Sequence, residues 1–113
     1  MLFRSIKRME TIKSNRIRKT KAGLSGEILH IDSFGNIVTS FRHNNLPVGS
    51  FIVYLGENKI GRLKRTYGSV KSGTPVAYIN SFGFLEIAVN SGSAAEYYSI
   101  DYKSKEKILI ATS

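Results

Sequence analysis

The sequence His30-Ile-Asp-Ser-Phe-Gly-Asn-Ile-Val-Thr-Ser-Phe41 places a tight Asp-Ser-Phe-Gly-Asn segment between two runs of strand-forming residues. β-Branched and aromatic residues favour strands, whereas Asp, Gly and Asn favour turns. The pattern predicts a β-hairpin in which Gly35 takes a positive φ and Phe34 fills the core. Asp32 and Asn36 would cap backbone donors in this hairpin. The alternative is that the same turn binds a ligand.

From Gly26 onward, apolar residues recur with a period of two in short runs that are separated by turn residues. We expect seven strands: Glu27–Ile31, Ile37–Phe41, Phe51–Leu55, Lys59–Lys64, Pro75–Asn80, Phe84–Val89 and Lys107–Ala111. Gly56–Asn58 is typical of a hairpin connection, and Lys71–Pro75 of a turn that enters a strand. Ser91–Tyr98 has a capping residue ahead of good helix formers. The sequence therefore predicts an all-β fold, a small barrel or sandwich with one short helix.

The positive charge is concentrated at the N-terminal end of the chain. The net charge of the 113 residues is +9. Residues 1–22 hold eight Lys or Arg against one Glu, a net charge of +7, and residues 23–113 carry the remaining +2. We therefore divide the chain into a basic arm, residues 1–22, and a β domain, residues 23–113. This division argues against a folded basic face for nucleic acid.

The basic arm has Leu2, Phe3, Ile6 and Met9 at roughly helical spacing, which permits a short amphipathic helix. We favour a solvated arm or residual linker, because short helices are marginal without packing. The arm lacks the continuous apolar run of a secretory signal, although its Arg-rich, acid-poor start resembles a mitochondrial presequence. The sequence leaves these alternatives open.

Composition excludes several classes of protein. No apolar run approaches the roughly 20 residues needed to cross a bilayer, so we expect a soluble protein without membrane contact. The chain has no cysteine and two histidines, His30 and His43, neither of which lies in a nucleophile or metal motif. We expect no metal site and no catalytic residue in this chain. The absence of cysteine is compatible with the cytoplasmic location that we expect.

A short repeat indicates where a site would lie. The segment Ile31-Asp-Ser-Phe-Gly35 is nearly repeated as Ile79-Asn-Ser-Phe-Gly83, each time between the end of one strand and the start of another. A shared turn type or chance would also produce two copies. If both turns converge on one rim of the barrel, they form a pocket.

Recognition of a purine is the binding chemistry that these turns favour. A carboxamide offers one acceptor and two donors, so Asn36 or Asn90 has the groups needed to read a purine edge. A nearby Phe34, Phe82 or Tyr67 would stack on the base, an interaction worth about 1–3 kcal/mol. The phosphate-binding and dinucleotide fingerprints are absent from the sequence.

Three blocks of sequence occur in order and at a spacing that resembles one known family. They are Gly26-Glu-Ile-Leu-His-Ile-Asp-Ser-Phe-Gly-Asn-Ile-Val-Thr39, Arg65-Thr-Tyr-Gly-Ser-Val70 with Gly73, and Asn80-Ser-Phe-Gly-Phe-Leu-Glu-Ile-Ala-Val-Asn-Ser-Gly-Ser-Ala-Ala95. They resemble the C-terminal domain of the S-adenosyl-L-methionine (SAM) hydroxide adenosyltransferases, the SAM-hydrolysing relatives of fluorinase and chlorinase. The resemblance runs from about Gly26 to near Ile110.

The resemblance implies a two-domain subunit, with an N-terminal α/β domain and a C-terminal β-barrel-like domain, assembled as a trimer. SAM would lie between the N-terminal domain of one subunit and the C-terminal domain of the next. Water or halide would attack C5′ of the ribose and release L-methionine. SAM is the substrate in this scheme, and we expect no further cofactor.

The resemblance assigns substrate contacts to seven residues: Asp32, Phe34, Asn36, Tyr67, Ser81, Asn90 and Ser91. Asp32 and Ser81 would hold the amino-carboxylate end of the methionine. Phe34 and Tyr67 would flank the adenine, and Asn36 would hydrogen-bond its edge. The backbone near the last two residues would complete the recognition.

Several departures from the family pattern limit the expected activity. Phe82 stands where an Arg contacts substrate in fluorinase-type enzymes and Val38 where a Trp sits, so we expect no halogenation. Ser40 replaces the usual Asn of a Thr-Asn pair. The family's N-terminal domain, with its ribose-binding acid and water-activating residues, has no counterpart in these 113 residues. We therefore expect a truncated domain, inactive alone, whose partner is a homotrimer or a separately encoded N-terminal domain.

Two alternatives come from other classes of protein. A small basic β-barrel that binds nucleic acid would use its arm for phosphates and Phe or Tyr faces for bases, and its affinity would collapse with added salt. The +2 charge of residues 23–113 counts against it. A purely structural assembly domain would form stable trimers and show no response to adenosine.

Overall fold

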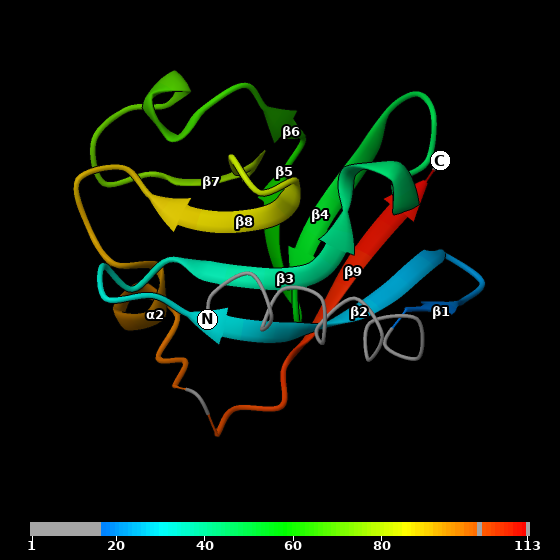
Figure 1. Cartoon of the computed structure of the whole chain (residues 1–113), viewed down its shortest axis with the longest axis horizontal. Helices are drawn as coiled ribbons and strands as arrows, with labels where there is room; N and C mark the ends of the chain where they lie inside the picture. Colours follow the sequence, from blue (N-terminus) through cyan, green and yellow to red (C-terminus); the bar gives the residue numbers. More distant parts are fainter. Residues whose placement is uncertain (1–16, 102, 113) are drawn as a thin grey trace.

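The computed structural model describes residues 17–101 and 103–112 (Figure 1). The strands are β1 (Arg18–Lys19), β2 (Gly23–Ile31), β3 (Ile37–Arg42), β4 (Phe51–Leu55), β5 (Asn58–Gly61), β6 (Leu63–Lys64), β7 (Pro75–Ile79), β8 (Phe84–Val89) and β9 (Lys107–Thr112). The helices are α2 (Ala94–Tyr97) and two 3₁₀ turns, η1 (His43–Asn45) and η2 (Tyr67–Ser69). The predicted all-β fold with one short helix is confirmed. The helix considered for the basic arm, over Leu2 to Met9, lies outside the described residues.

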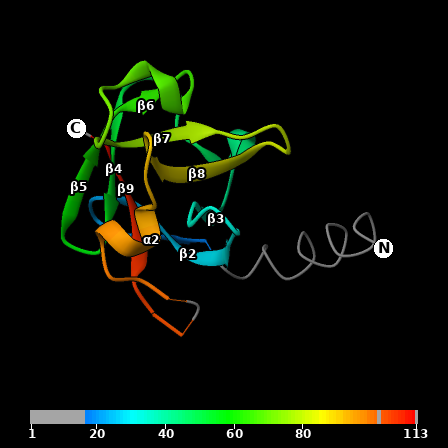
Figure 2. The ribbon, with the colours of Figure 1, turned by 90° about the vertical axis from the view of Figure 1, so that its left-hand side faces the viewer.

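The strands form one strongly curved sheet in the order β5-β4-β9-β2-β3-β8-β7-β6, with β1 paired to β2. The pairs are antiparallel except β6 with β7. β2 joins the two halves, because Gly23–Glu27 pairs with β9 and Ile28–Ile31 pairs with β3. Seen in two directions, the sheet wraps into a nearly closed barrel (Figures 1 and 2). Among the described residues, no helix is long and apolar enough to span a membrane.

The described part of the chain has nine strands where the sequence predicts seven. One addition is β1, which pairs Arg18 with Ser25 inside the segment that we assigned to the basic arm. The other arises because the run Lys59–Lys64 is divided after Gly61, whose φ is +121°. That conformation is open to glycine and turns the chain from β4 toward β7, which nearly closes the barrel.

The core lies inside the barrel and is built mainly from β3, β4, β8 and β9. Its buried members are Ile37, Phe41, Phe51, Val53, Leu55, Ala77, Leu85, Ile87, Val89, Ala94, Ile108 and Ile110. All six residues of β8 are buried. Because alternate side chains of a strand point to opposite faces, Leu85, Ile87 and Val89 enter the core while Glu86 points to the other face. This second face of β8 carries the candidate site.

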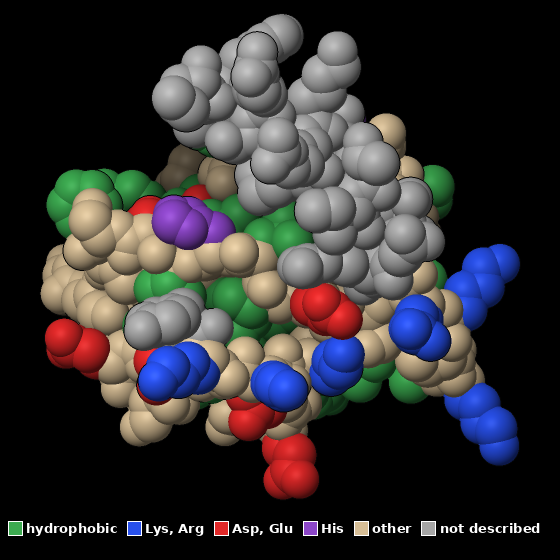
Figure 3. Space-filling model, turned by 60° about the horizontal axis from the view of Figure 1, so that its bottom comes forward, with side chains coloured by type: hydrophobic (Ala, Val, Ile, Leu, Met, Phe, Trp, Pro, Cys, Tyr) green, Lys and Arg blue, Asp and Glu red, His purple; other side chains and the backbone are tan. Residues whose placement is uncertain are grey.

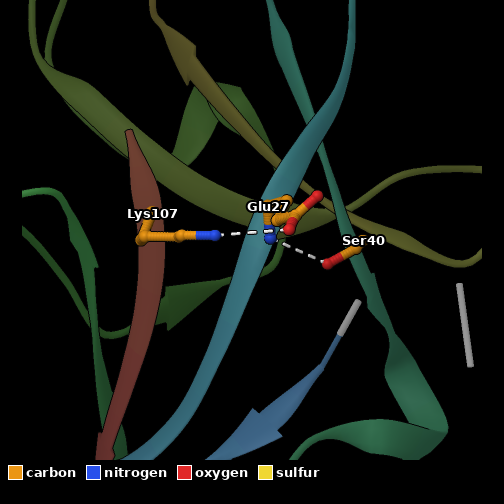
Figure 4. A network of polar contacts seen from close by, with 3 residues as sticks. All are labelled: Glu27, Ser40 and Lys107. Carbon is orange, nitrogen blue, oxygen red and sulfur yellow. Dashed lines mark hydrogen bonds and ion pairs between the residues drawn. The ribbon is translucent and has the colours of Figure 1, made fainter. Parts of the chain in front are cut away.

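Strand β2 is fixed to both of its neighbours near Gly26 (Figure 4). The Glu27 backbone N–H donates to Ser40 Oγ on β3 at 3.0 Å, and Lys107 Nζ on β9 donates to Glu27 Oε2 at 3.2 Å. A Cβ atom at Gly26 would lie 2.6 Å from the Phe41 ring. Glycine is therefore required here by the close approach of β3. The β2–β3 register shifts just beyond this point, between Ile28 and His30.

Candidate functional site

The first turn, residues 32–36, is held by one carboxylate oxygen. Asp32 Oδ1 accepts the backbone N–H groups of Phe34 and Asn36, both at 2.9 Å. Gly35 has a φ of +82°, so the predicted positive φ and the capping role of Asp32 are confirmed. The prediction that Phe34 fills the core is wrong, because its side chain is 77% exposed at the tip of the turn. The first fully buried side chain after the turn is that of Ile37.

The second turn, residues 80–84, has the same hydrogen bonds. Asn80 Oδ1 accepts the N–H groups of Phe82 at 2.9 Å and Phe84 at 3.0 Å, and Gly83 has a φ of +89°. Phe82 is 56% exposed, as its counterpart Phe34 is exposed in the first turn. The sequence repeat is therefore a structural repeat. The two turns differ chiefly in charge, because the capping residue is an aspartate in one and an asparagine in the other.

The two turns lie at opposite ends of the β3–β8 pair. Each turn immediately precedes its strand, and the two strands are antiparallel, with Ile37 opposite Ile87 and Arg42 opposite Phe84. The expectation that both turns converge on one rim is therefore wrong. The first turn lies beside the end of β8, and the second beside the end of β3, where the His43 N–H donates to the Gly83 carbonyl at 2.9 Å.

Two adjacent hollows connect the turns across the outer face of β7 and β8. The first has a volume of about 580 Å³ and is lined by Asp32, Phe34, Asn36, Tyr67, Tyr78, Ala88, Val89, Ser91 and Gly92. The second, about 400 Å³, is lined by Arg65, Thr66, Tyr67, Tyr78, Ile79, Asn80, Ser81, Phe82 and Glu86. Because Tyr67 and Tyr78 line both, we call the two hollows together the groove. Their volumes fall in the range of small-molecule sites, roughly 300–1,000 Å³.

The groove gathers most of the residues that the resemblance assigns to substrate. Five line the first hollow: Asp32, Phe34, Asn36, Tyr67 and Ser91. Ser81 lines the second hollow instead. The structure thus brings the first turn, η2 and the segment after β8 together, although they are distant in sequence.

Asn90 has a structural role instead of facing either hollow. Its Nδ2 donates to the Val70 carbonyl at 2.7 Å, and its backbone N–H donates to the Thr74 carbonyl at 3.1 Å. Its own carbonyl accepts the Gly73 N–H at 2.7 Å. These bonds fix the loop between η2 and β7 to the end of β8. The suggestion that the Asn90 carboxamide reads a purine is therefore not supported by its position.

The first hollow presents polar groups that the fold does not use. Within residues 17–101 and 103–112, the Asn36 carboxamide makes no hydrogen bond, although its backbone is part of the turn. The prediction that the Asn36 side chain caps a backbone donor is therefore wrong, because Asp32 Oδ1 alone accepts the two turn N–H groups. Asp32 uses Oδ1 for the turn, and its Oδ2 has no hydrogen-bond partner in the same part of the chain. The hollow therefore offers an amide and a carboxylate oxygen beside the exposed rings of Phe34 and Tyr67.

A buried carboxylate lies where the two hollows meet. Glu86 is 6% exposed, and it accepts hydrogen bonds from the Tyr78 hydroxyl at 2.5 Å and from Asn80 Nδ2 at 2.9 Å. Burial raises the pKa of Tyr78 above its usual range, and the hydrogen bond to Glu86 and the charges of Glu86 and Asp32 raise it further. This cluster was not predicted from the sequence. The available signal was a lone acid in the apolar run Phe84–Val89, because a buried charge requires hydrogen-bond partners.

Two comparisons with known proteins point to the same family. Residues 26–107 match the family described as SAM hydroxide adenosyltransferase C-terminal domain. The (R)-S-adenosyl-L-methionine hydrolase of Thermus thermophilus is 47% identical over 74 residues, which are 66% of this chain and 28% of that protein.

Two solved structures share the fold. A conserved hypothetical protein of Thermus thermophilus has a TM-score of 0.64 at 40% identity, over 76% of this chain and 34% of its own. An uncharacterized conserved protein of Thermotoga maritima has a TM-score of 0.62 at 26% identity, over 83% of this chain and 39% of its own. The chain thus spans about a third of the length of these relatives. With most of its β domain matched, the chain belongs to the SAM hydroxide adenosyltransferase C-terminal domain family.

Proposed function

We propose that this chain binds the adenosyl part of SAM in the groove and serves a reaction that converts SAM and water into adenosine and L-methionine. Family membership and the name of the Thermus thermophilus hydrolase support the reaction. The observation that carries the binding role is the Asn36 carboxamide, which has no hydrogen-bond partner among the described residues and lines the first hollow together with the exposed rings of Phe34 and Tyr67. SAM is the substrate, and no further cofactor is proposed.

The chemistry of each end of the groove fits one part of this substrate. The Asn36 amide would pair with the adenine edge, and Phe34 and Tyr67 would stack on its faces, a contribution of about 1–3 kcal/mol per stacked base. Asp32 Oδ2 would accept the ammonium group of the methionine part. Ser81, from the second hollow, would bind its carboxylate.

We propose further that a second chain covers this face. Phe34, Tyr67 and Phe82 are 77%, 55% and 56% exposed, so a ligand in the groove would keep one open side. Half-open sites forfeit burial and preorganisation, which makes binding by the single chain weak. An exposed aromatic surface also favours a partner. The partner would be a second copy in a trimer or a separately encoded N-terminal domain, and turnover would require it.

An NMR titration with adenosine and then SAM, at physiological salt, tests the binding role. We expect shifts confined to the groove, and the variant Asn36→Ala should weaken adenosine binding about tenfold, the loss of one good hydrogen bond. Its urea midpoint should stay nearly unchanged, because the turn uses only the backbone of Asn36. Asn44→Ala, an exposed change outside both hollows, is the matched control.

Two outcomes would contradict the proposal. No shift at millimolar ligand would show that the chain alone is no SAM-binding module, and stable trimers in sedimentation would then favour a purely structural assembly domain. Strong destabilisation by Asn36→Ala without any effect on ligand would favour a plain hairpin. The matches above give no support to nucleic-acid binding, and on the face in Figure 3 the Lys and Arg side chains lie interspersed with Asp and Glu.

A further inference from the structure

Three polar side chains form a directed chain between the two hollows. The Tyr78 hydroxyl donates to Glu86 Oε2, and Asn80 Nδ2 donates to Glu86 Oε1. An ionised carboxylate only accepts, so both neighbours must donate to it. Asn80 is fixed in this orientation, because its Oδ1 already accepts the N–H groups of Phe82 and Phe84. The direction of every hydrogen bond in the chain is therefore determined.

This direction makes the Tyr78 oxygen an acceptor toward the groove. A tyrosine has one hydroxyl proton, and Tyr78 donates it in the hydrogen bond to Glu86. Any further hydrogen bond to the Tyr78 oxygen must therefore come from a donor on the ligand. Tyr78 lines the first hollow together with Asp32, whose charge contributes to the raised pKa of the tyrosine. The Asp32 Oδ2 atom has no partner among residues 17–101 and 103–112. Two residues with acceptor oxygens, Tyr78 and Asp32, thus line the same hollow.

We propose that Tyr78 is a further ligand-binding residue, which together with Asp32 binds the ammonium group of the ligand's amino-acid part, and that Glu86 and Asn80 are positioning residues that keep Tyr78 an acceptor. This inference rests on the proposed function. An ammonium group has three N–H donors and satisfies both oxygens, whereas a sulfonium has none. Glu86 also explains why the second turn uses Asn80, because an aspartate there would place two carboxylates side by side.

Two variants with opposite expectations test the direction of the chain. In Glu86→Gln, the new amide must keep its oxygen toward Asn80 and turn its NH₂ group toward Tyr78, which releases the tyrosine proton into the hollow. Tyr78 then meets the ammonium as a donor. The double variant Asn80→Asp/Glu86→Gln reverses the hydrogen bond between residues 80 and 86, because the glutamine NH₂ group now donates to the aspartate. The glutamine oxygen is then again free to accept from Tyr78. Net charge in the double variant equals that of the natural chain.

Calorimetric titration with three probes gives the readout. S-Adenosyl-L-homocysteine carries the ammonium without the sulfonium, SAM carries both, and adenosine carries neither. We expect the natural chain to bind the first two about tenfold more tightly than adenosine, as one charge-assisted hydrogen bond allows. Glu86→Gln should abolish this preference and leave adenosine affinity within about twofold. The double variant should restore the preference.

Each contrary result has a distinct meaning. The inference would be overturned if Glu86→Gln weakened adenosine binding as much as it weakened SAM binding. It would also be overturned if the double variant did not recover the preference for ligands that carry the ammonium group. Either result would give Glu86 a merely structural role. Equal affinity of the natural chain for adenosine and S-adenosyl-L-homocysteine would overturn it without any variant, while leaving adenosine binding intact. Absence of adenosine binding by the natural chain would overturn both this inference and the proposed function.

Discussion

Asp32 and Asn80 show how little a turn of this type requires from its first side chain. In both turns a single Oδ1 atom accepts two backbone N–H groups, and a glycine with positive φ follows three residues later. The second side-chain atom is left for another purpose. In Asp32 it is an anionic oxygen beside the first hollow, and in Asn80 it is the NH₂ group that binds Glu86.

Asp32→Asn should therefore separate the two purposes of Asp32. Asn80 demonstrates that asparagine supports the same turn, so we expect the free energy of unfolding to change by less than about 1 kcal/mol. Affinity for SAM should fall about tenfold with the loss of the charge. Urea unfolding and calorimetric titration measure the two effects.

Asp32→Ala is the matched control, because it removes the turn acceptor as well. Two backbone donors then lose their partner, which we expect to cost about 1–3 kcal/mol of stability. Equal destabilisation by the two variants would contradict the division of labour between the two carboxylate oxygens.

Individual residues were predictable from sequence where the cause is local. The positive φ of Gly35 and the cap by Asp32 follow from the turn chemistry of Asp and Gly. The exposure of Phe34 and the structural bonds of Asn90 depend on which distant segments lie beside them. No local pattern contains that information. The assignments of Asp32, Asn36 and Ser81 to substrate remain predictions.

At the scale of elements, the first turn is packed against α2. The Ala95 N–H donates to the Gly35 carbonyl at 2.9 Å, and a Cβ atom at Gly35 would lie 1.9 Å from Ser93 Oγ. Ser93 in turn caps the helix, because its Oγ accepts the Glu96 N–H at 3.1 Å. A Cβ atom at the equivalent Gly83 would lie 3.6 Å from His43 Nδ1, which is an ordinary van der Waals contact. The repeat is thus alike in its bonds and unlike in its surroundings.

Gly35→Ala and Gly83→Ala should consequently differ in cost. Both place a side chain at positive φ, a strain of about 1 kcal/mol or more. Only the first also collides with Ser93, so we expect about 2–4 kcal/mol for Gly35→Ala and about 1 kcal/mol for Gly83→Ala. Urea denaturation of the two variants under identical conditions measures the difference. Equal costs would contradict the tight packing of the turn on α2.

The elements themselves were largely predictable, and their arrangement was not. Short alternating runs indicated each predicted strand, and the capping pattern indicated α2. The division at Gly61 was missed, because a glycine in an alternating run is compatible with a continuous strand. The expectation that both turns share a rim was wrong because the β3–β8 pairing is a long-range choice. Strand order is set by the whole core and leaves no local signature.

At the scale of the whole molecule, the two faces of one curved sheet have different roles. Its inside is filled by the apolar core, and the outer face of β7 and β8 carries the groove. One tyrosine with a raised pKa belongs to each region, because Tyr78 lines the groove and Tyr98 contacts the core. Tyr98 packs against the core, and burial, with a contribution from Tyr97, raises its pKa to about 12. The pKa of Tyr78 is raised as well, with burial as the largest cause.

These tyrosines should make the fold sensitive to alkali. The unfolded chain loses a tyrosine proton near pH 10, whereas the native state keeps that of Tyr98 until about pH 12. The native state therefore binds more protons in this interval, and stability falls as pH rises from about 10 to about 12. Urea midpoints measured across that range should decline less steeply for Tyr98→Phe than for the natural chain. Parallel declines would contradict the shifted pKa of Tyr98.

The paired turns also make the chemistry of the groove easy to alter by mutation. Codons for Asp and Asn differ in their first base alone, as do codons for Glu and Gln. A single-base substitution at position 32 would therefore remove the anionic oxygen while leaving a turn of proven geometry, as Asn80 shows. At position 80 the reverse change needs a companion at Glu86, again one base away. A single-base substitution at position 32 thus changes the ligand preference expected of the groove, whereas the paired changes at positions 80 and 86 preserve it, and neither requires a change of backbone.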